Sequence, residues 1–291
     1  MAISAKLVKQ LRDQTGVGMM DAKKALQETD GDIDKAVDYL RESGQMKAAK
    51  KADRVAAEGL AKIYIEGNTA AILEVNTETD FAAKNDKFTE IIDEIGHALV
   101  QYKPQDMEEA KEKVEINGES LEDYLTQKTA IIGERINFRR FTVFEKTDDQ
   151  VFGQYVHMGG KIATLVLVNS SDDQLALNLA LHVSGIAPKY VSEEQIPQEE
   201  RDHEREVLTE QAKNEGKPEK IIEKMVEGRM HKFYAEVCLN DQDYLLDDSM
   251  TVKELLDKED ASVEDFRRYA VGEGIERKEE DFAAEVQSQM R

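Results

Sequence analysis

One arrangement of elements occurs twice in this chain of 291 residues, and it constrains the fold more than any other feature. In residues 60–76 and again in residues 151–169, two runs of apolar residues flank a short turn that contains glycine. Each pair of runs predicts a β-hairpin, and a stripe of helical period follows each hairpin. The repeat therefore predicts a duplicated α+β core with antiparallel sheets.

The two copies differ in the connection between the second strand and the helix. About a dozen residues follow Asn76 before the first helical stripe, against about five after Asn169. The longer connection contains Thr79-Asp80-Phe81, and connections of this kind often carry function. Periodicity alone favours a Phe81 that folds inward and anchors the loop. The alternative is an exposed aromatic ring, next to a carboxylate, that enters another molecule.

Helical patterns lie on either side of this duplicated core. Residues 1–54 contain three short amphipathic stretches, which predict a small three-helix module. Residues 193–237 are highly charged and break at Gly216-Lys217-Pro218, which predicts an antiparallel helical hairpin inserted in the second copy. Near the end, Phe282, Val286 and Met290 repeat every four residues and predict a terminal helix.

We therefore expect four parts. Residues 1–54 form the N-terminal module, and residues 55–140 form the first half of the core. Residues 141–264 form the second half with its hairpin insertion, and residues 265–291 form a C-terminal helical module.

The charge of the chain disfavours some partners. The net charge is −22, whereas residues 1–54 carry eight Lys and three Arg against seven Asp and two Glu, or +2, which leaves −24 for the remainder. Such an acidic body repels phosphate backbones, so we expect no direct nucleic-acid binding. The chain contains no run of 18 apolar residues, so we expect no membrane span. The single Cys238 and the absence of an apolar leader after Met1 favour a cytoplasmic protein.

The usual patterns of catalytic and cofactor sites fail on inspection. Residues 30–41 begin like a calcium loop but have Lys35 in place of the glycine at the sixth position and Arg41 in place of the glutamate ligand at the twelfth. A phosphate loop at Gly159-Gly160-Lys161 lacks its first glycine and the serine or threonine after the lysine. The five histidines have no zinc spacing with cysteine. We therefore expect no enzyme, no cofactor and no metal site, a structural role for His182 and a packed thiol at Cys238.

Five segments, in order along the chain, resemble the bacterial elongation factor Ts family, the guanine-nucleotide exchange factors for elongation factor Tu. They are residues 11–26, 72–81, 132–140, 216–230 and 272–286. A small departure is Ala82, where valine is usual. The resemblance implies a ubiquitin-associated-like (UBA-like) N-terminal module, a core of two related halves, a coiled-coil hairpin and a C-terminal module. It also implies a role in translation, with elongation factor Tu as the partner.

The resemblance also implies which residues act. Asp80 and Phe81, with Thr79 before them, would enter the partner's nucleotide-binding domain near its magnesium site, so that magnesium is dislodged from the partner. Further contacts would come from the following residues: Ile132, Gly133, His157, Met19, Met20 and Lys23. This role requires Phe81 to be exposed, against the expectation from periodicity alone.

Three other interpretations remain open from the sequence. The protein could bind elongation factor Tu without exchanging nucleotide, as a holdase or assembly partner. It could be an enzyme, although no nucleophile–base pair, phosphate loop or metal cluster supports that. Its N-terminal module could also read ubiquitin.

Overall fold

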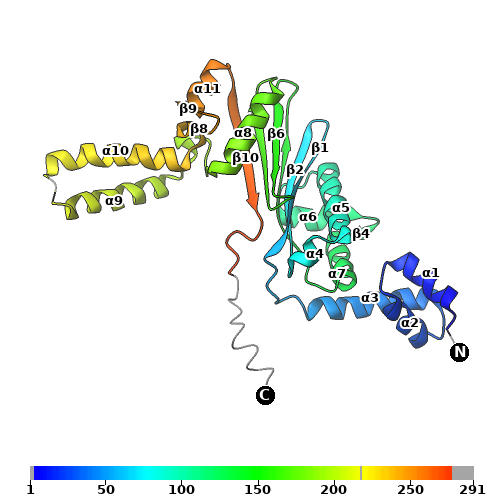
Figure 1. The fold of residues 1–291 in the computed structure, drawn as a ribbon. Coiled ribbons are helices and arrows are strands. Elements are labelled where there is room, and N and C mark those ends of the chain that lie inside the picture. The colour runs from blue at the N-terminus through cyan, green and yellow to red at the C-terminus, as the bar shows by residue number, and fades with distance from the viewer. Residues whose placement is uncertain (1–2, 217, 277–291) are drawn as a thin grey trace.

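A computed structural model of the protein describes residues 3–216 and 218–276 (Figure 1). Two three-stranded antiparallel sheets form its centre. The first has the order β1-β2-β5 and the second the order β6-β7-β10. Their strands are β1 (Glu58–Glu66), β2 (Thr69–Thr77), β5 (Asn137–Glu145), β6 (Val151–His157), β7 (Ile162–Asn169) and β10 (Ser262–Ala270). The α+β class with antiparallel sheets is confirmed.

The duplication is longer than the sequence predicts. In each copy the hairpin is followed by a helix, then by a small two-stranded ribbon and a second helix, and finally by a third strand beside the second hairpin strand. The first copy contains α5 (Asp86–Tyr102), α6 (Met107–Lys113), β3 (Glu115–Ile116), β4 (Glu119–Ser120) and α7 (Leu121–Ile132). The second contains α8 (Asp173–Ile186), β8 (Asp243–Tyr244), β9 (Asp247–Thr251) and α11 (Val252–Lys258).

Apolar burial holds each helix on its own sheet and the two sheets on each other. Phe88, Ile92 and Leu99 of α5 are fully buried in the first core, and Leu179 and Val183 of α8 are fully buried in the second. A third cluster, which includes Ala61, Ile72, Leu165 and Tyr269, draws its residues from both sheets. Burial of the apolar side chains in this third cluster stabilises the contact between the two halves, since each fully buried large apolar side chain contributes about 1.5–3 kcal/mol to folding.

A buried carboxylate adds a polar link between the halves. Glu74 of β2 is fully buried and accepts hydrogen bonds from Arg139 Nη1 at 3.0 Å and from Arg140 Nε at 2.5 Å, both on β5. It also accepts from the amide of Gly272, beyond β10, at 2.8 Å, and from Asn76 Nδ2 at 3.0 Å. The carboxylate thus joins the first sheet to the segment that leaves the second.

Residues 3–49 form three helices around a small core: α1 (Ala5–Thr15), α2 (Met19–Glu28) and α3 (Ile33–Ala49). Ser4 caps α1 and Asp32 caps α3, each accepting a hydrogen bond from a backbone amide of the first turn. The long α3 reaches the core beside α7 (Figure 1). Gly44 of α3 lies against Ala130 of α7.

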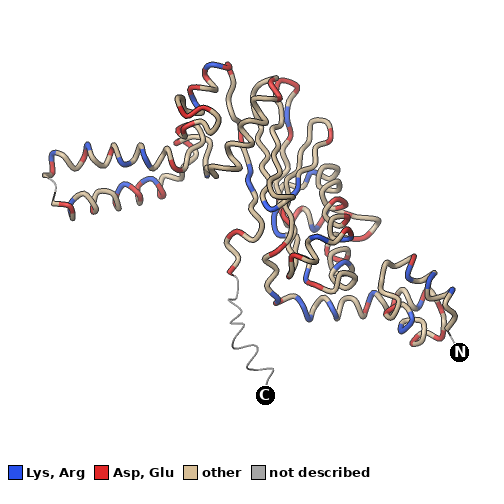
Figure 2. Tube along the Cα trace, viewed as in Figure 1, with Lys and Arg blue, Asp and Glu red and all other residues tan. Residues whose placement is uncertain are grey.

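The predicted helical hairpin consists of α9 (Gln198–Asn214) and α10 (Glu219–Val237), which lie side by side and project from the core (Figure 1). Ala212, Val226 and Met230 are among its buried apolar residues. Figure 2 shows acidic and basic residues interspersed along both helices. Glu193–Gln195 form only a 3-10 turn, so the hairpin helices begin later than expected, and a second such turn spans Leu239–Asp241.

Two of the expected boundaries fall inside strands. Pairing of β5 with β2 continues to Glu145, and pairing of β10 with β7 continues to Ala270. Boundaries after residues 140 and 264 would therefore cut the two sheets, and residues 265–270 belong to a strand and not to a helical module. The predicted terminal helix, with Phe282, lies outside the described residues. Within the described ranges, no helix has the length and apolar character needed to cross a bilayer.

Candidate functional site

The connection that is longer in the first copy contains one helical turn, α4 (Asp80–Ala83). Thr79 is its N-cap, and Thr79 Oγ1 accepts a hydrogen bond from the amide of Ala82 at 3.2 Å. Ala82 and Ala83 are buried, and α4 packs on the start of the first hairpin. The second copy has only residues 170–172 between β7 and α8, so it has no equivalent of this turn.

Phe81 points away from the protein. Its exposed fraction is 82%, the highest among the exposed large apolar residues of the described chain. An aromatic ring in water forfeits about 1.5–3 kcal/mol of burial. The capped turn presents this ring to solvent, which contradicts the inward-folded Phe81 and agrees with the exposure that the resemblance requires.

Asp80 lies beside Phe81 at the start of α4 and forms an ion pair with Lys84, at 2.7 Å between Nζ and Oδ2. The hydrogen bond from Lys84 lowers the pKa of Asp80 against a smaller opposing effect of desolvation, and the charges of Lys84 and Lys161 add to the lowering. The carboxylate is therefore ionised at neutral pH. Because both side chains are exposed, their ion pair is weak, and a competing cation or hydrogen-bond donor can replace Lys84 as the partner of Asp80.

Glu134, just beyond α7, fixes the base of this turn. Its carboxylate accepts hydrogen bonds from Thr77 Oγ1 at 3.0 Å, from the Thr79 amide at 2.9 Å and from Thr79 Oγ1 at 2.7 Å. A second carboxylate bonds in the reverse direction, since Glu78 accepts from the amide of Arg135 at 2.7 Å. We call this reciprocal pair the Glu78–Glu134 clamp.

The Glu78–Glu134 clamp also places Ile132 and Gly133 next to the base of α4. Ile132 is the last residue of α7 and is partly buried, while Gly133 is exposed and caps the helix with φ of 85°. A left-handed backbone favours glycine at this position. The Gly133 carbonyl accepts a hydrogen bond from Lys51 Nζ. The predicted contact residues after α7 are thus adjacent to α4.

His157 reaches this region from the other half of the core. It ends β6 and is exposed, with Met158 73% exposed beside it. The turn after it is pinned to the first hairpin because the amide of Ala61 donates to the carbonyl of Gly160 at 2.7 Å. The next residue, Lys161, pairs with Glu58 at 2.7 Å and contributes to the pKa shift of Asp80.

Met19, Met20 and Lys23 lie on α2, apart from α4. All three are exposed, Met19 by 61% and Met20 by 75%. The turn before them contacts the core where α5 begins, since Lys87 Nζ donates to the carbonyl of Gly16 at 3.3 Å. The structure thus brings Thr79, Asp80, Phe81, Ile132, Gly133 and His157 toward one region and keeps the three N-terminal residues on a neighbouring helical unit.

The family comparison bears directly on this region. A family model described as Elongation factor TS matches residues 78–273. The chain belongs to the elongation factor Ts family. Elongation factor Ts proteins are translation elongation factors that act in nucleotide exchange on elongation factor Tu. The match starts at Glu78 of the clamp and includes α4, the end of α7 and His157, whereas α2 with its two methionines lies outside it.

Two other reactive groups of this elongation factor Ts chain, His182 and Cys238, are engaged in packing. His182 is fully buried; its Nδ1 accepts from the amide of Leu245 at 3.1 Å and its Nε2 lies 2.9 Å from Gln242 Oε1. Burial lowers the pKa of His182 and raises that of the Cys238 thiol to about 12. Within residues 3–216 and 218–276, no three His, Cys, Asp or Glu side chains gather as a metal site.

Two residues of the site escape prediction from the sequence. Lys84 follows Asp80 at the i,i+4 spacing of a helical ion pair, but the sequence of this connection gives no sign that it is helical. Glu134 lies 55 residues from Thr79, and no local pattern joins them. Its one sequence signal is its position directly after the predicted contact residue Gly133.

The clamp leads to a first prediction. Glu134→Ala removes three hydrogen bonds from residues 77–79, so α4 should lose its fixed orientation while the cores remain intact. We expect exchange activity to fall about tenfold to a hundredfold, because misplacing an acting group by about 1 Å can cost about a hundredfold in rate. Labelled-GDP release from elongation factor Tu measures the loss, and circular dichroism checks the fold.

Glu134→Gln should keep only part of the wild-type activity, because its amide nitrogen cannot accept a hydrogen bond from Thr79. Wild-type activity in Glu134→Ala would show that the clamp is dispensable; Glu236→Ala on α10 is the matched control.

Proposed function

We propose that this protein binds elongation factor Tu in its GDP form and promotes GDP release by inserting Asp80 and Phe81 near the partner's magnesium and phosphate site. The observation that carries the proposal is an aromatic side chain 82% exposed on a turn that is capped, packed and clamped at its base. The hydrogen bonds at the cap and the base of the turn give the exposed ring a defined direction, in which it can enter a cavity of a partner.

The proposed mechanism needs no covalent chemistry. GTPases hold GDP largely through magnesium and backbone amides around the phosphates. A ring inserted between packed elements of the partner would displace those amides. A close-packed interior is hardly compressible, so whole elements shift when a side chain enters it. The ionised Asp80 would compete for the donors or the cation that face the phosphate.

Exchange of this kind is a coupling of binding free energies. If the factor weakens GDP binding, GDP must weaken binding of the factor by the same ratio. The protein then accelerates release through a transient complex of factor, GTPase and GDP, and a second nucleotide displaces the factor. It therefore acts as an exchange factor and not as an enzyme that makes or breaks bonds.

We assign supporting contacts to Thr79, Ile132 and Gly133, which border α4, and to His157 at the end of β6. Met19, Met20 and Lys23 form a second contact surface on α2, within an N-terminal three-helix module that we regard as UBA-like. We also propose that α9 and α10 act as a coiled-coil hairpin, that nucleic acid is not bound directly, and that the protein works in the cytoplasm.

The experiment that tests this function is release of fluorescent GDP from elongation factor Tu, chased with unlabelled GDP. Substoichiometric amounts of the protein should accelerate release of all the label. A holdase that binds without exchange would leave the rate unchanged, even where a pull-down shows a complex. That outcome would refute the proposal.

Asp80 should contribute less than Phe81. Asp80→Asn keeps the size of the side chain and removes its charge, so the proposed competition near the partner's magnesium weakens while the turn stays in place. We expect less than about a tenfold loss of stimulated GDP release, since exposed charges interact weakly. Lys84→Ala, which frees Asp80 from its intramolecular partner, should not reduce the rate. A larger loss in Asp80→Asn than in Phe81→Ala would reverse the proposed roles.

A further inference from the structure

The N-terminal module is joined to the core by a contact between α3 and α7 that is small and largely polar. The apolar cluster of the module lies within residues 3–40, and within the described ranges no buried apolar cluster joins it to the first core. Besides the approach of Gly44 to Ala130, the contact contains an exposed ion pair of Arg41 with Asp123 at 3.3 Å. Exposed ion pairs contribute little each, so the orientation of the module depends on further contacts.

A ring of contacts ties the segment after α3 to the base of α4. Arg54 pairs with Glu78, at 3.2 Å between Nη1 and Oε2. Glu78 also accepts from the amide of Arg135 at 2.7 Å, and Arg135 Nη1 donates to the carbonyl of Arg54 at 2.6 Å. Three segments of the chain thus meet in what we call the Arg54–Glu78–Arg135 ring.

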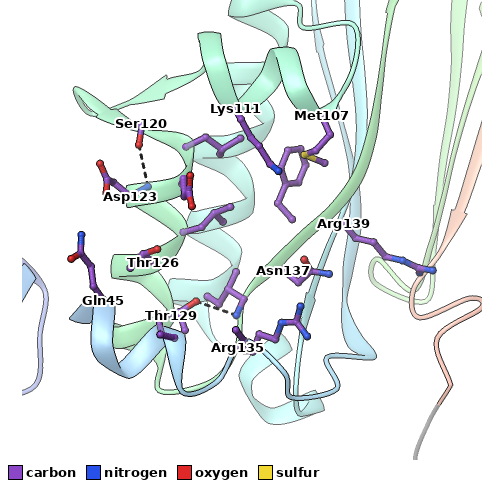
Figure 3. Close-up of a pocket in the computed structure, with 18 residues that line it drawn as sticks. Gln45, Met107, Lys111, Ser120, Asp123, Thr126, Thr129, Arg135, Asn137 and Arg139 are labelled. Atoms are coloured by element: carbon purple, nitrogen blue, oxygen red, sulfur yellow. Dashed lines mark hydrogen bonds between the residues drawn. The ribbon is translucent and has the colours of Figure 1, made fainter. Parts of the chain in front are cut away.

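Two of the three ring residues belong to the core. Glu78 directly precedes the N-cap of α4. Arg135 lies just beyond α7 at the edge of a pocket, and the amide of the residue that follows it donates to Thr129 Oγ1 of α7 at 3.2 Å (Figure 3). Lys51 adds a contact at the same place, since its Nζ donates to the carbonyl of Gly133. The ring therefore holds the segment after α3 against the part of the core that fixes α4.

We propose that Arg54 and Arg135 are positioning residues, which hold the N-terminal module so that α2 and α4 meet one partner molecule together. This role rests on the proposed function, since it joins the contact surface on α2 to the α4 turn. Two linked sites reinforce each other most when the link already matches the distance between their targets. A module fixed beforehand also avoids the loss of affinity that ordering it during binding would cause. The ring should therefore lower the concentration of factor that exchange requires, and leave the rate of the bound complex unchanged.

The double variant Arg54→Ala/Arg135→Ala breaks the ring. It removes both guanidinium groups but keeps the amide of residue 135, which still donates to Glu78, so the clamp stays in place. Arg54→Lys/Arg135→Lys is the conservative variant, because each guanidinium uses one nitrogen in the ring. Lys6→Ala/Lys9→Ala, at two exposed positions of α1, is the control with the same change of charge.

The first readout is a distance in the free full-length protein. Spin labels on Lys24→Cys of α2 and Glu90→Cys of α5, both exposed positions, report how the module sits on the core. Cys238 is fully buried and does not react with the label. We expect one narrow distance distribution with the ring intact, a broad one in the alanine pair, and a narrow one in the lysine pair and the control.

The second readout separates affinity from rate in labelled-GDP release from elongation factor Tu. The alanine pair should raise the half-saturating concentration of factor about three- to tenfold, as expected for the loss of two exposed contacts. Its maximal rate should change by less than about twofold, since the clamp and α4 are intact. The lysine pair and the control should match wild type in both quantities.

An unchanged distance distribution in the alanine pair would overturn the proposal, and so would an unchanged half-saturating concentration. A lower maximal rate at an unchanged half-saturating concentration would also overturn it, because the ring would then act on α4 alone. If the wild-type protein fails to accelerate release, the proposed function is refuted and the positioning role with it. The distances in the free protein would still show whether the ring fixes the module, so the two failures are distinguishable.

Discussion

Phe81→Ala should reduce stimulated GDP release by about 30-fold or more. Truncating a central aromatic contact commonly removes 2 kcal/mol or more of interaction free energy, and about 1.4 kcal/mol is one factor of ten. The fold should be unaffected because Phe81 is 82% exposed and packs on little of its own chain. The measurement is the rate of labelled-GDP release at saturating factor, together with thermal melting of the free variant.

Two further variants make this result specific. Phe81→Leu keeps part of the apolar volume and should have intermediate activity if the side chain acts as a wedge. Ile221→Ala removes an exposed apolar side chain from α10 and should leave release unchanged. A folded Phe81→Ala protein with the wild-type rate would contradict the assigned role of Phe81.

Glu74→Ala should lower the free energy of unfolding by about 3–5 kcal/mol, the range measured when one partner of a buried charge pair is removed. The substitution leaves Arg139 and Arg140 without their buried carboxylate and removes the acceptor of the Gly272 amide. Chemical denaturation followed by circular dichroism measures the change. Glu66→Ala, an exposed carboxylate on β1, should change stability by less than about 0.5 kcal/mol.

The effect of Glu74 should depend on pH in one direction. Burial by itself raises the pKa of Glu74, but hydrogen bonds from the Gly272 amide and Asn76 and the charge of Arg140 outweigh it and hold the pKa below its usual range. A lowered pKa in the folded state stabilises the fold above the unfolded pKa of about 4.3 and ceases to do so as pH falls through the folded value. The stability gap between wild type and Glu74→Ala should therefore narrow below about pH 4; a constant gap would argue against the ionised carboxylate.

Local patterns predict much of this fold because its hairpins and helices are built from local signals. The glycine turns after β1 and β6 and the α7 cap at Gly133 are all readable from adjacent residues. The third strand of each sheet is harder to find, because a bulge interrupts its alternation. The register shifts between Val263 and Asp265 in β10, and between Glu74 and Val75 opposite β5. A bulge places an extra residue in one strand and breaks the period of two.

The site is only partly predictable for a related reason. The longer connection in the first copy predicts its position, and the resemblance supplies the residues that we propose for it. The direction of Phe81, however, depends on how α4 sits on β1 and on the bonds from Glu134, a residue distant in sequence. The periodicity of the residues around Phe81 reports neither the position of α4 on β1 nor the bonds from Glu134, so it favours the wrong orientation of the ring.

The measurement that tests the central claim most directly is the affinity of this protein for elongation factor Tu with and without GDP, by titration calorimetry. Coupling requires tighter binding to the nucleotide-free partner, by about 150-fold for a coupling free energy near 3 kcal/mol. If Phe81 carries the coupling, Phe81→Ala should bring the ratio of the two affinities close to one. An unchanged ratio in a folded Phe81→Ala protein would contradict the account.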